Sequence, residues 1–140
     1  MNNWIQIISA FVGGFGFAIV FGSNKKHWLL IAVDAMLSWM VYLGCCTFTS
    51  SFFANLLAAA FCSLYAHIAA RAVKAPTTCL LTPATVPFIP GGSLYYTVYY
   101  ALSRNGELFR KYAIATGETV FAVAIGFSLI YICFWTYERQ

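Results

Sequence analysis

The sequence predicts an all-α integral membrane protein with about five transmembrane helices, the fourth of them broken by a segment rich in proline and glycine. Hydrophobic residues make up 61% of the 140 residues and charged residues only 9%, whereas soluble domains carry about 25% charged residues. The mean hydropathy of +0.77 agrees with this composition. A helical crossing of a bilayer takes about 20 residues, so we expect a single transmembrane domain, residues 1–140, with almost no room for an aqueous one.

Five apolar segments predict the spans. They cover about residues 4–22, 28–48, 52–70, 77–103 and 112–137. Short polar turns separate them, at residues 23–27, 49–51, 71–76 and 104–111. The fourth segment differs from the others because prolines and glycines interrupt it, although it carries no charge from Ala75 to Ser103.

The distribution of positive charge leaves two topologies open for the fourth segment. A single crossing puts 5 basic residues on one side of the membrane and 3 on the other. The first set is Lys25, Lys26, Arg71, Lys74 and Arg139, and the second is Arg104, Arg110 and Lys111. A re-entrant hairpin changes the counts to 7 against 1, which the positive-inside rule prefers. The segment has 27 residues, enough for one broken span of about 40 Å, whereas a hairpin leaves two arms of only about a dozen residues. We therefore expect one crossing.

Small residues recur at a spacing of four in two of the predicted spans. The first stripe is Ala10, Gly14, Ala18 and Gly22, and the second is Ala54, Ala58, Cys62, Ala66 and Ala70. Small side chains at this spacing let two helix backbones approach closely, and such packing holds helices together in lipid. We interpret the stripes as helix-packing faces, with a pore-lining role as the alternative.

A ribbon of polar residues runs beside the second stripe. It consists of Asn55, Ser63, His67 and Arg71. Polar side chains are costly in hydrocarbon, so such a ribbon faces protein or a water-filled cavity. Two interpretations stay open, hydrogen bonding between helices and the lining of a substrate path, and Arg71 alone also fits an anchor at the membrane interface.

The break in the fourth segment is the strongest candidate for a substrate site. Three prolines within eight residues, followed by Gly91-Gly92, exclude an unbroken helix. Discontinuous helices bind substrates and ions in secondary transporters because their backbone N–H and C=O groups are free. The candidate substrate-binding residues are Thr85, Pro87, Pro90, Gly91, Gly92, Ser93 and Tyr95. We expect positive backbone angles at the two glycines and a half-helix after them whose N-terminus receives a carboxylate. The alternative is a kink that serves packing only.

Two acids inside the predicted spans are candidates for proton coupling, Asp34 and Glu118. A neutral carboxyl is much less costly in hydrocarbon than a carboxylate, so a buried acid tends to change protonation when access switches. Glu118 is slightly favoured, since Thr116, Gly117 and Thr119 around it indicate a polar, closely packed helix face. A carboxyl near the interface, paired with a basic residue, is the alternative for both.

Composition and spacing argue against other functions. The five cysteines form no C-x-x-C pair, so we expect neither a metal site nor a cofactor. His27 and His67 are the only histidines, too few for the clustered groups that a membrane enzyme needs. The basic residues flank apolar runs as helix anchors do, and we expect no binding of nucleic acid.

The residues around the break resemble those of a known family. The runs Lys74-Ala75-Pro76-Thr77-Thr78, Thr82-Pro83 and Pro87-Phe88-Ile89-Pro90-Gly91-Gly92-Ser93-Leu94-Tyr95 are similar to the smaller membrane subunit of the threonine/serine exporter family, and the resemblance covers nearly the whole chain. It implies the second of two five-span halves, in the bacterial inner membrane, with the N-terminus outside and the C-terminus inside. It also implies a larger partner subunit, export driven by the proton gradient, and threonine, serine or succinate as substrates.

The leading hypothesis is therefore a subunit of a proton-coupled exporter of small metabolites that carry a carboxylate. In this mechanism the break around Pro87–Tyr95 holds the carboxylate, an acid exchanges the proton, and two halves rock around the site. The alternative is a scaffold subunit that stabilises a transporting partner without binding substrate. The lipid bilayer, the larger subunit and a small polar metabolite are the expected partners.

Overall fold

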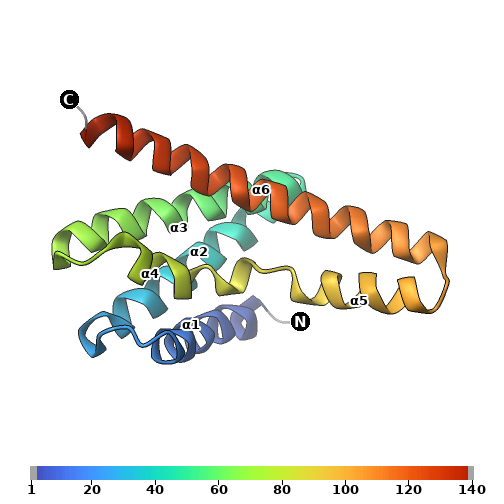
Figure 1. Cartoon of the computed structure of the whole chain (residues 1–140), viewed down its shortest axis with the longest axis horizontal. Coiled ribbons are helices and arrows are strands. Elements are labelled where there is room, and N and C mark those ends of the chain that lie inside the picture. The colour runs from blue at the N-terminus through green and yellow to red at the C-terminus, as the bar shows by residue number, and fades with distance from the viewer. Residues whose placement is uncertain (1–2, 139–140) are drawn as a thin grey trace.

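A computed structural model describes residues 3–138, with side chains up to residue 136, and it is helical throughout this range apart from short turns (Figure 1). The helices are α1 (Asn3–Val20), η1 (Lys25–His27), α2 (Trp28–Cys46), α3 (Ser51–Val73), α4 (Thr77–Ala84), η2 (Val86–Phe88), α5 (Gly91–Leu102) and α6 (Gly106–Glu138). Four stretches of the described chain are long and apolar enough to cross a membrane: Asn3–Val20, Lys25–Cys46, Ser51–Val73 and Gly106–Thr136. The fold class is thus the predicted one, with the fourth segment divided into two short helices.

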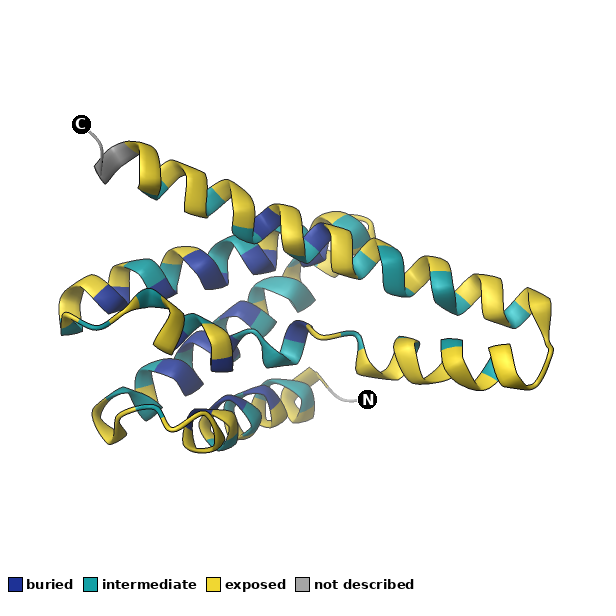
Figure 2. Cartoon of the chain, in the orientation of Figure 1, coloured by how far each residue is buried: buried dark blue, intermediate teal, exposed yellow. Residues whose placement is uncertain are grey.

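Helices α1, α2 and α3 pack side by side, and α4 lies against all three. α6 packs on α3 and runs parallel to it. Gly126 lies against Leu56 and Ala59, and Phe134 lies against His67, so residue numbers rise in the same direction along both helices. Buried residues gather in α1 to α4 and in the middle of α6 (Figure 2). Most of the buried hydrophobic side chains are alanines, so the core is held together by close helix contact more than by large side chains.

The packing interpretation of the small-residue stripes is confirmed. All five residues of the stripe in α3 are buried, and the buried residues of α1 are Ala10, Gly14 and Ala18. A Cβ atom on Gly14 would lie only 2.7 Å from the Cβ of Ala35. Gly22 is the exception, since it lies beyond α1 with φ at +67° and is exposed. It forms the left-handed end of the helix, with the N–H of Ser23 donating to the carbonyl of Ala18 over 3.0 Å.

A close contact between α3 and α6 at Gly126 gives a test of this packing. A Cβ on Gly126 would lie 2.6 Å from the carbonyl oxygen of Leu56, and backbone cannot move aside as a side chain can. We expect Gly126→Leu to separate the two helices and to destabilise the fold by about 1–3 kcal/mol or more, measured as a lower thermal midpoint in detergent. Gly117→Leu is the matched control, because a Cβ there meets nothing within 4 Å. Equal midpoints for the two variants would contradict this arrangement of α3 and α6.

The last helix begins earlier than predicted. Residues 104–111 are predicted as a loop, but α6 starts at Gly106. Arg104 takes a left-handed backbone angle of 54°, and the Asn105 side chain accepts a hydrogen bond from the N–H of Leu108 over 3.4 Å. An asparagine cap starts the helix here although the residues that follow are charged. With 33 residues, α6 is about 50 Å long and exceeds the hydrocarbon thickness of about 30 Å.

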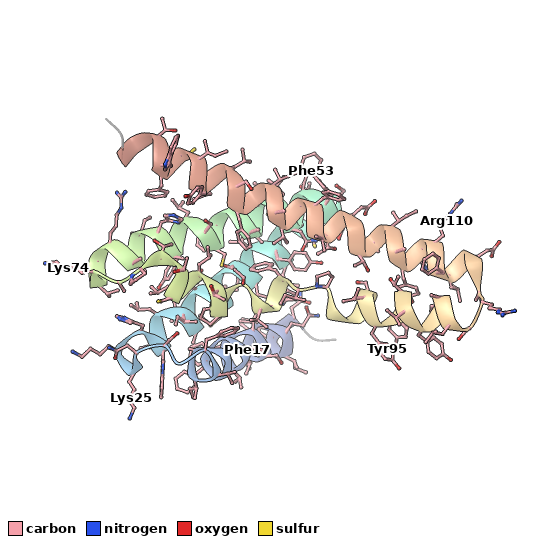
Figure 3. The ribbon with its side chains drawn as sticks, viewed as in Figure 1. Phe17, Lys25, Phe53, Lys74, Tyr95 and Arg110 are labelled. Atoms are coloured by element: carbon pink, nitrogen blue, oxygen red, sulfur yellow. The ribbon has the colours of Figure 1, made fainter. Side chains whose placement is uncertain are left out.

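The fourth segment passes through the molecule in one direction. α4, η2 and α5 follow one another away from the α3–α4 turn, and α5 does not fold back on α4 (Figure 1). Lys25 and Lys74 lie at one end of the molecule and Arg110 at the other (Figure 3). Arg139, which the charge count placed with Lys25, lies outside the described residues. This path favours one broken crossing over the re-entrant hairpin.

α5 and the first part of α6 form a hairpin that extends beyond the other helices (Figure 1). α5 packs mainly against α6 and has no buried residue (Figure 2). The contact includes aromatic pairs. The rings of Tyr100 and Tyr112 stack with centroids 5.5 Å apart, and those of Tyr96 and Tyr112 lie 5.2 Å apart at an angle of 30°. Most of the α5 surface is therefore left open to lipid or to another chain.

Candidate functional site

The structure encloses one of the two candidate acids, Asp34, between α2 and α3. Its side chain is only 1% exposed. The Ser38 hydroxyl donates to Oδ1 over 3.1 Å, and the Cys62 thiol donates to Oδ2 over 3.7 Å. Cys62 also belongs to the hydrophobic cluster that contains Leu80 of α4. The carboxyl thus lies in the core of the bundle, next to the helix that leads into the break.

This environment suits a group that gains and loses a proton. A carboxylate deep in an apolar bundle is costly, whereas the neutral acid is tolerated. The Ser38 hydroxyl can donate to either carboxyl form and can also accept from the neutral acid. The two neighbours can therefore follow a change in protonation by rotating their hydrogens, without a change in the helix backbone.

Glu118, which the sequence slightly favoured, lies on an exposed part of α6. Beside it, the Thr119 hydroxyl donates within α6 to the carbonyl of Ala115 over 3.0 Å. The Thr116 hydroxyl lies 2.8 Å from the carbonyl of Tyr112 and 3.4 Å from the hydroxyl of Thr97 on α5. A Cβ on Gly117 meets nothing within 4 Å. The expected polar face therefore meets another helix only at Thr116, and Glu118 itself is exposed. The geometry favours Asp34 as the internal acid.

Some residues of the polar ribbon of α3 have hydrogen-bond or ring partners within the chain, and one hydroxyl has none among the described residues. The Asn55 amide donates to the carbonyl of Ser51 over 2.8 Å, and the His67 ring stacks on Phe134 at 4.6 Å. Arg71 lies over the same ring at 4.9 Å. The Ser63 hydroxyl is buried without a hydrogen-bond partner among the described residues.

The unsatisfied hydroxyl borders a groove between α3, α4 and α6. The groove measures about 430 Å³, and its lining includes Ser63, His67, Leu81, Ser128 and Tyr131. A buried hydroxyl usually has a partner, so one left open next to a groove can be satisfied by water or a ligand. Ser63 and His67 border the groove and fit the path interpretation of the ribbon. The hydrogen bond from Asn55 to Ser51 stays within α3, so it is not the expected bond between helices.

The break lies between two further grooves. On one side, Val86 and Pro87 border a groove of about 290 Å³ together with Gln6, Ser9 and Trp39. The indole N–H of Trp39 is buried without a partner in the described part of the chain. On the other side, Thr85, Ile89 and Pro90 border a groove of about 330 Å³ against α6. The predicted site residues Thr85, Pro87 and Pro90 thus lie along the break but face different grooves.

The start of α5 corrects one expectation. Gly91 and Gly92 have no positive φ angle, because they form the first turn of α5, and a Cβ on either one meets nothing within 4 Å. The two glycines are therefore not needed here for a turn with positive φ. Within the described residues, the N–H groups of Gly92 and Ser93 have no backbone partner, whereas that of Gly91 donates to the carbonyl of Ile89 over 2.7 Å. Tyr95 is 65% exposed and stacks on Tyr99, so it lies on the open surface of α5.

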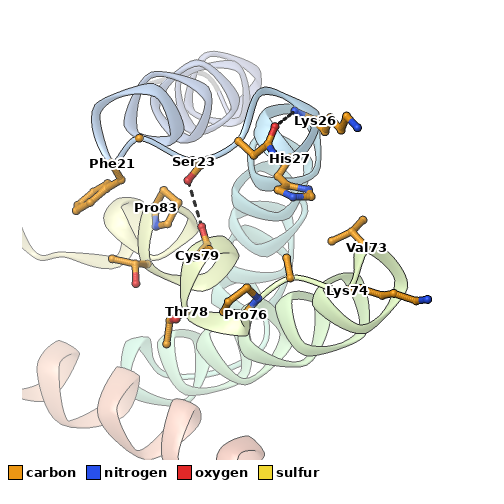
Figure 4. Close-up of a pocket in the computed structure, with 14 residues that line it drawn as sticks. Phe21, Ser23, Lys26, His27, Val73, Lys74, Pro76, Thr78, Cys79 and Pro83 are labelled. Carbon is orange, nitrogen blue, oxygen red and sulfur yellow. Dashed lines mark hydrogen bonds between the residues drawn. The ribbon is translucent and has the colours of Figure 1, made fainter.

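One further pocket was not predicted. It has a volume of about 700 Å³ and lies where the α1–α2 turn meets the α3–α4 turn (Figure 4). Its lining includes Ser23, Lys26, His27, Lys74, Thr78 and Thr82. The sequence carries a signal for it, since two clusters of basic and hydroxyl residues flank helices that must end on the same side of the membrane. Nothing in the sequence alone shows that the two clusters form opposite walls of one pocket.

The fold and these features define a class, the multi-pass membrane proteins with a broken helix and a buried acid. The family described as "Threonine/Serine exporter, ThrE" matches residues 6–133. The chain therefore belongs to the threonine/serine exporter family, a family of membrane transporters. Searches of curated proteins and of solved structures gave no match.

Proposed function

We propose that this chain is one subunit of a proton-coupled exporter of small metabolites that carry a carboxylate. It acts with a larger membrane subunit of the same family in a bacterial inner membrane. The observation that carries this proposal is the position of Asp34, enclosed between α2 and α3 and adjoining the helix that leads into the break. Family membership supports export, and the buried acid supports coupling to protons.

The break supplies the substrate contacts in this mechanism. The free N–H groups of Gly92 and Ser93 lie at the positive end of the α5 dipole and can receive a carboxylate. The grooves on both sides of the break give the substrate room to reach it. Asp34 is protonated on one side of the membrane and deprotonated on the other, and each change biases the packing of α4. This bias links proton transfer at Asp34 to substrate binding at the break.

The partner subunit covers surfaces that this chain leaves open. α5 contributes no residue to the core, and its hairpin with α6 extends past the bundle (Figure 1). Threonine, serine and succinate are the substrate candidates that the family implies. All three carry a carboxylate, which is the group that the break is proposed to bind.

Efflux from vesicles tests the proposal against the scaffold alternative. Vesicles are prepared with this chain, with the larger subunit and with both, and are loaded with radiolabelled succinate or threonine. We expect export only when both are present, and we expect it to follow an imposed pH difference. If the larger subunit alone, at a matched amount, exported as much substrate as the two subunits together, the scaffold alternative would be supported.

The proposed orientation places the basic end of the molecule in the cytoplasm. Lys25→Cys lies at that end and Asn105→Cys in the α5–α6 turn, in a background whose 5 native cysteines are replaced by serine. We expect a membrane-impermeant maleimide to label Asn105→Cys in intact cells and Lys25→Cys only in inverted vesicles, because the end that carries more of the basic residues stays inside. Labelling of both from the same side would contradict the single broken crossing.

A further inference from the structure

The pocket at the basic end has walls from two turns that are far apart in the sequence. Ser23, Lys26 and His27 form one wall, and Lys74 and Thr78 belong to the other. Figure 4 shows His27 turned toward the space between the walls, while the side chains of Lys26 and Lys74 extend outward from it on one side. At about 700 Å³, the pocket is large enough for a small metabolite.

Hydrogen bonds hold the first wall in place and join it to α4. The Ser23 hydroxyl donates to the carbonyl of Cys79 over 3.3 Å, which ties the α1–α2 turn to α4. The indole N–H of Trp28 donates to the carbonyl of Ser23 over 2.8 Å, and the Asn24 side chain accepts from the N–H of Lys26 over 3.3 Å. The pocket is therefore formed before any ligand arrives, which lowers the entropy cost of binding.

The chemistry of the lining favours an anion. Two lysines and a histidine line the pocket, and none of its described lining residues is acidic. Nδ1 of His27 is buried and has no hydrogen-bond partner within the described ranges. Hydroxyl groups of Thr78 and Thr82 add neutral donors. Lysine ammonium groups, an imidazole and hydroxyls together match the oxygens of a carboxylate.

We propose that this pocket is a loading site, which binds the carboxylate of the metabolite at the basic end of the molecule before it reaches the break. The inference rests on the proposed function for the identity of the ligand, but the site is separate from the break and from Asp34. Lys26 and Lys74 supply the charge, and His27 supplies a directed contact deeper in the pocket.

Binding to the full-length chain in lipid nanodiscs tests the site. The probe is radiolabelled succinate in equilibrium dialysis, with nanodiscs of phosphatidylcholine and low salt. We expect the double variant Lys26→Gln, Lys74→Gln to bind about tenfold more weakly, since two cations near the ligand are lost, and we expect salt to weaken wild-type binding. The control Lys25→Gln, Lys111→Gln removes the same charge outside the pocket and should bind as the wild type does.

A second arm distinguishes a metabolite from a lipid headgroup, whose phosphate offers similar oxygens. Nanodiscs that contain phosphatidylglycerol should leave succinate binding largely intact. If phosphatidylglycerol abolishes succinate binding, the pocket is a lipid site and the inference fails. The same conclusion follows if Lys26 and Lys74 are needed for binding of this lipid but not of succinate. Wild-type affinity in the double variant overturns it as well. Lysine-dependent binding without any export in the vesicle assay would instead reject the proposed function and leave the site standing.

Discussion

Asp34→Asn is expected to abolish export driven by a pH difference, while exchange of substrate across the membrane persists. Asparagine keeps the size of the side chain and can still accept the hydrogen bond from Ser38, so the bundle should remain folded. The amide cannot take up and release a proton, and we expect net efflux under an imposed pH difference to fall by about tenfold or more when a proton step is removed. The measurement is efflux of labelled substrate from vesicles that hold this chain and the larger subunit.

Glu118→Gln serves as the matched control, because Glu118 is exposed on α6 while Asp34 is enclosed. We expect it to keep the wild-type response to the pH difference. The reverse result, a normal response in Asp34→Asn and none in Glu118→Gln, would move the coupling acid to the surface of α6. A normal response in both variants would place coupling in the partner subunit or remove it from the mechanism.

Leucine at the start of α5 is expected to have the second large effect. Gly91→Leu and Gly92→Leu add a side chain where the structure leaves open space, so membrane insertion and folding should be unchanged. The new side chain covers the free N–H groups and should reduce export by about tenfold or more, since a charge-assisted contact is worth about 1.5–3 kcal/mol. Efflux from the same vesicles measures this change, and the thermal midpoint shows whether the fold is intact.

Gly16→Leu is the control for these variants, because a Cβ at Gly16 in α1 also meets nothing within 4 Å. It adds the same apolar volume far from the break and should export normally. Normal export by Gly91→Leu and Gly92→Leu would show that the break is a packing kink and no substrate site.

The fold could be predicted because its determinants are local. A run of apolar residues must cross the bilayer as a helix, and prolines at positions 87 and 90 must interrupt one. The start of α6 was missed, since the charged residues Glu107, Arg110 and Lys111 are typical of a loop in a membrane protein. The asparagine cap at Asn105 outweighs this preference, because the first turns of α6 extend past the hydrophobic layer and charge there costs little.

The candidate site was harder to predict because it depends on which helix faces meet. The flanking residues of Glu118 carry more polar groups than those of Asp34, yet Asp34 is the one enclosed. Its partner Cys62 is 28 positions away in the sequence, so no local pattern could reveal the contact. The basic pocket could not be predicted for the same reason, since its walls come from two turns that are separated in the sequence by two helices. The positive φ angles expected at Gly91 and Gly92 do not occur, because the break ends at the proline before them and α5 begins at once.

Protection of the break by substrate tests most directly whether the transport path runs through this chain. A single cysteine is placed at the break as Ser93→Cys, in the cysteine-free background and with the larger subunit present. Ser103→Cys, beyond the end of α5, is its control. We predict that saturating transported substrate slows modification of Ser93→Cys by a methanethiosulfonate reagent and leaves Ser103→Cys unchanged. Equal rates at Ser93→Cys with and without substrate, in vesicles that export it, would contradict a substrate site in this subunit.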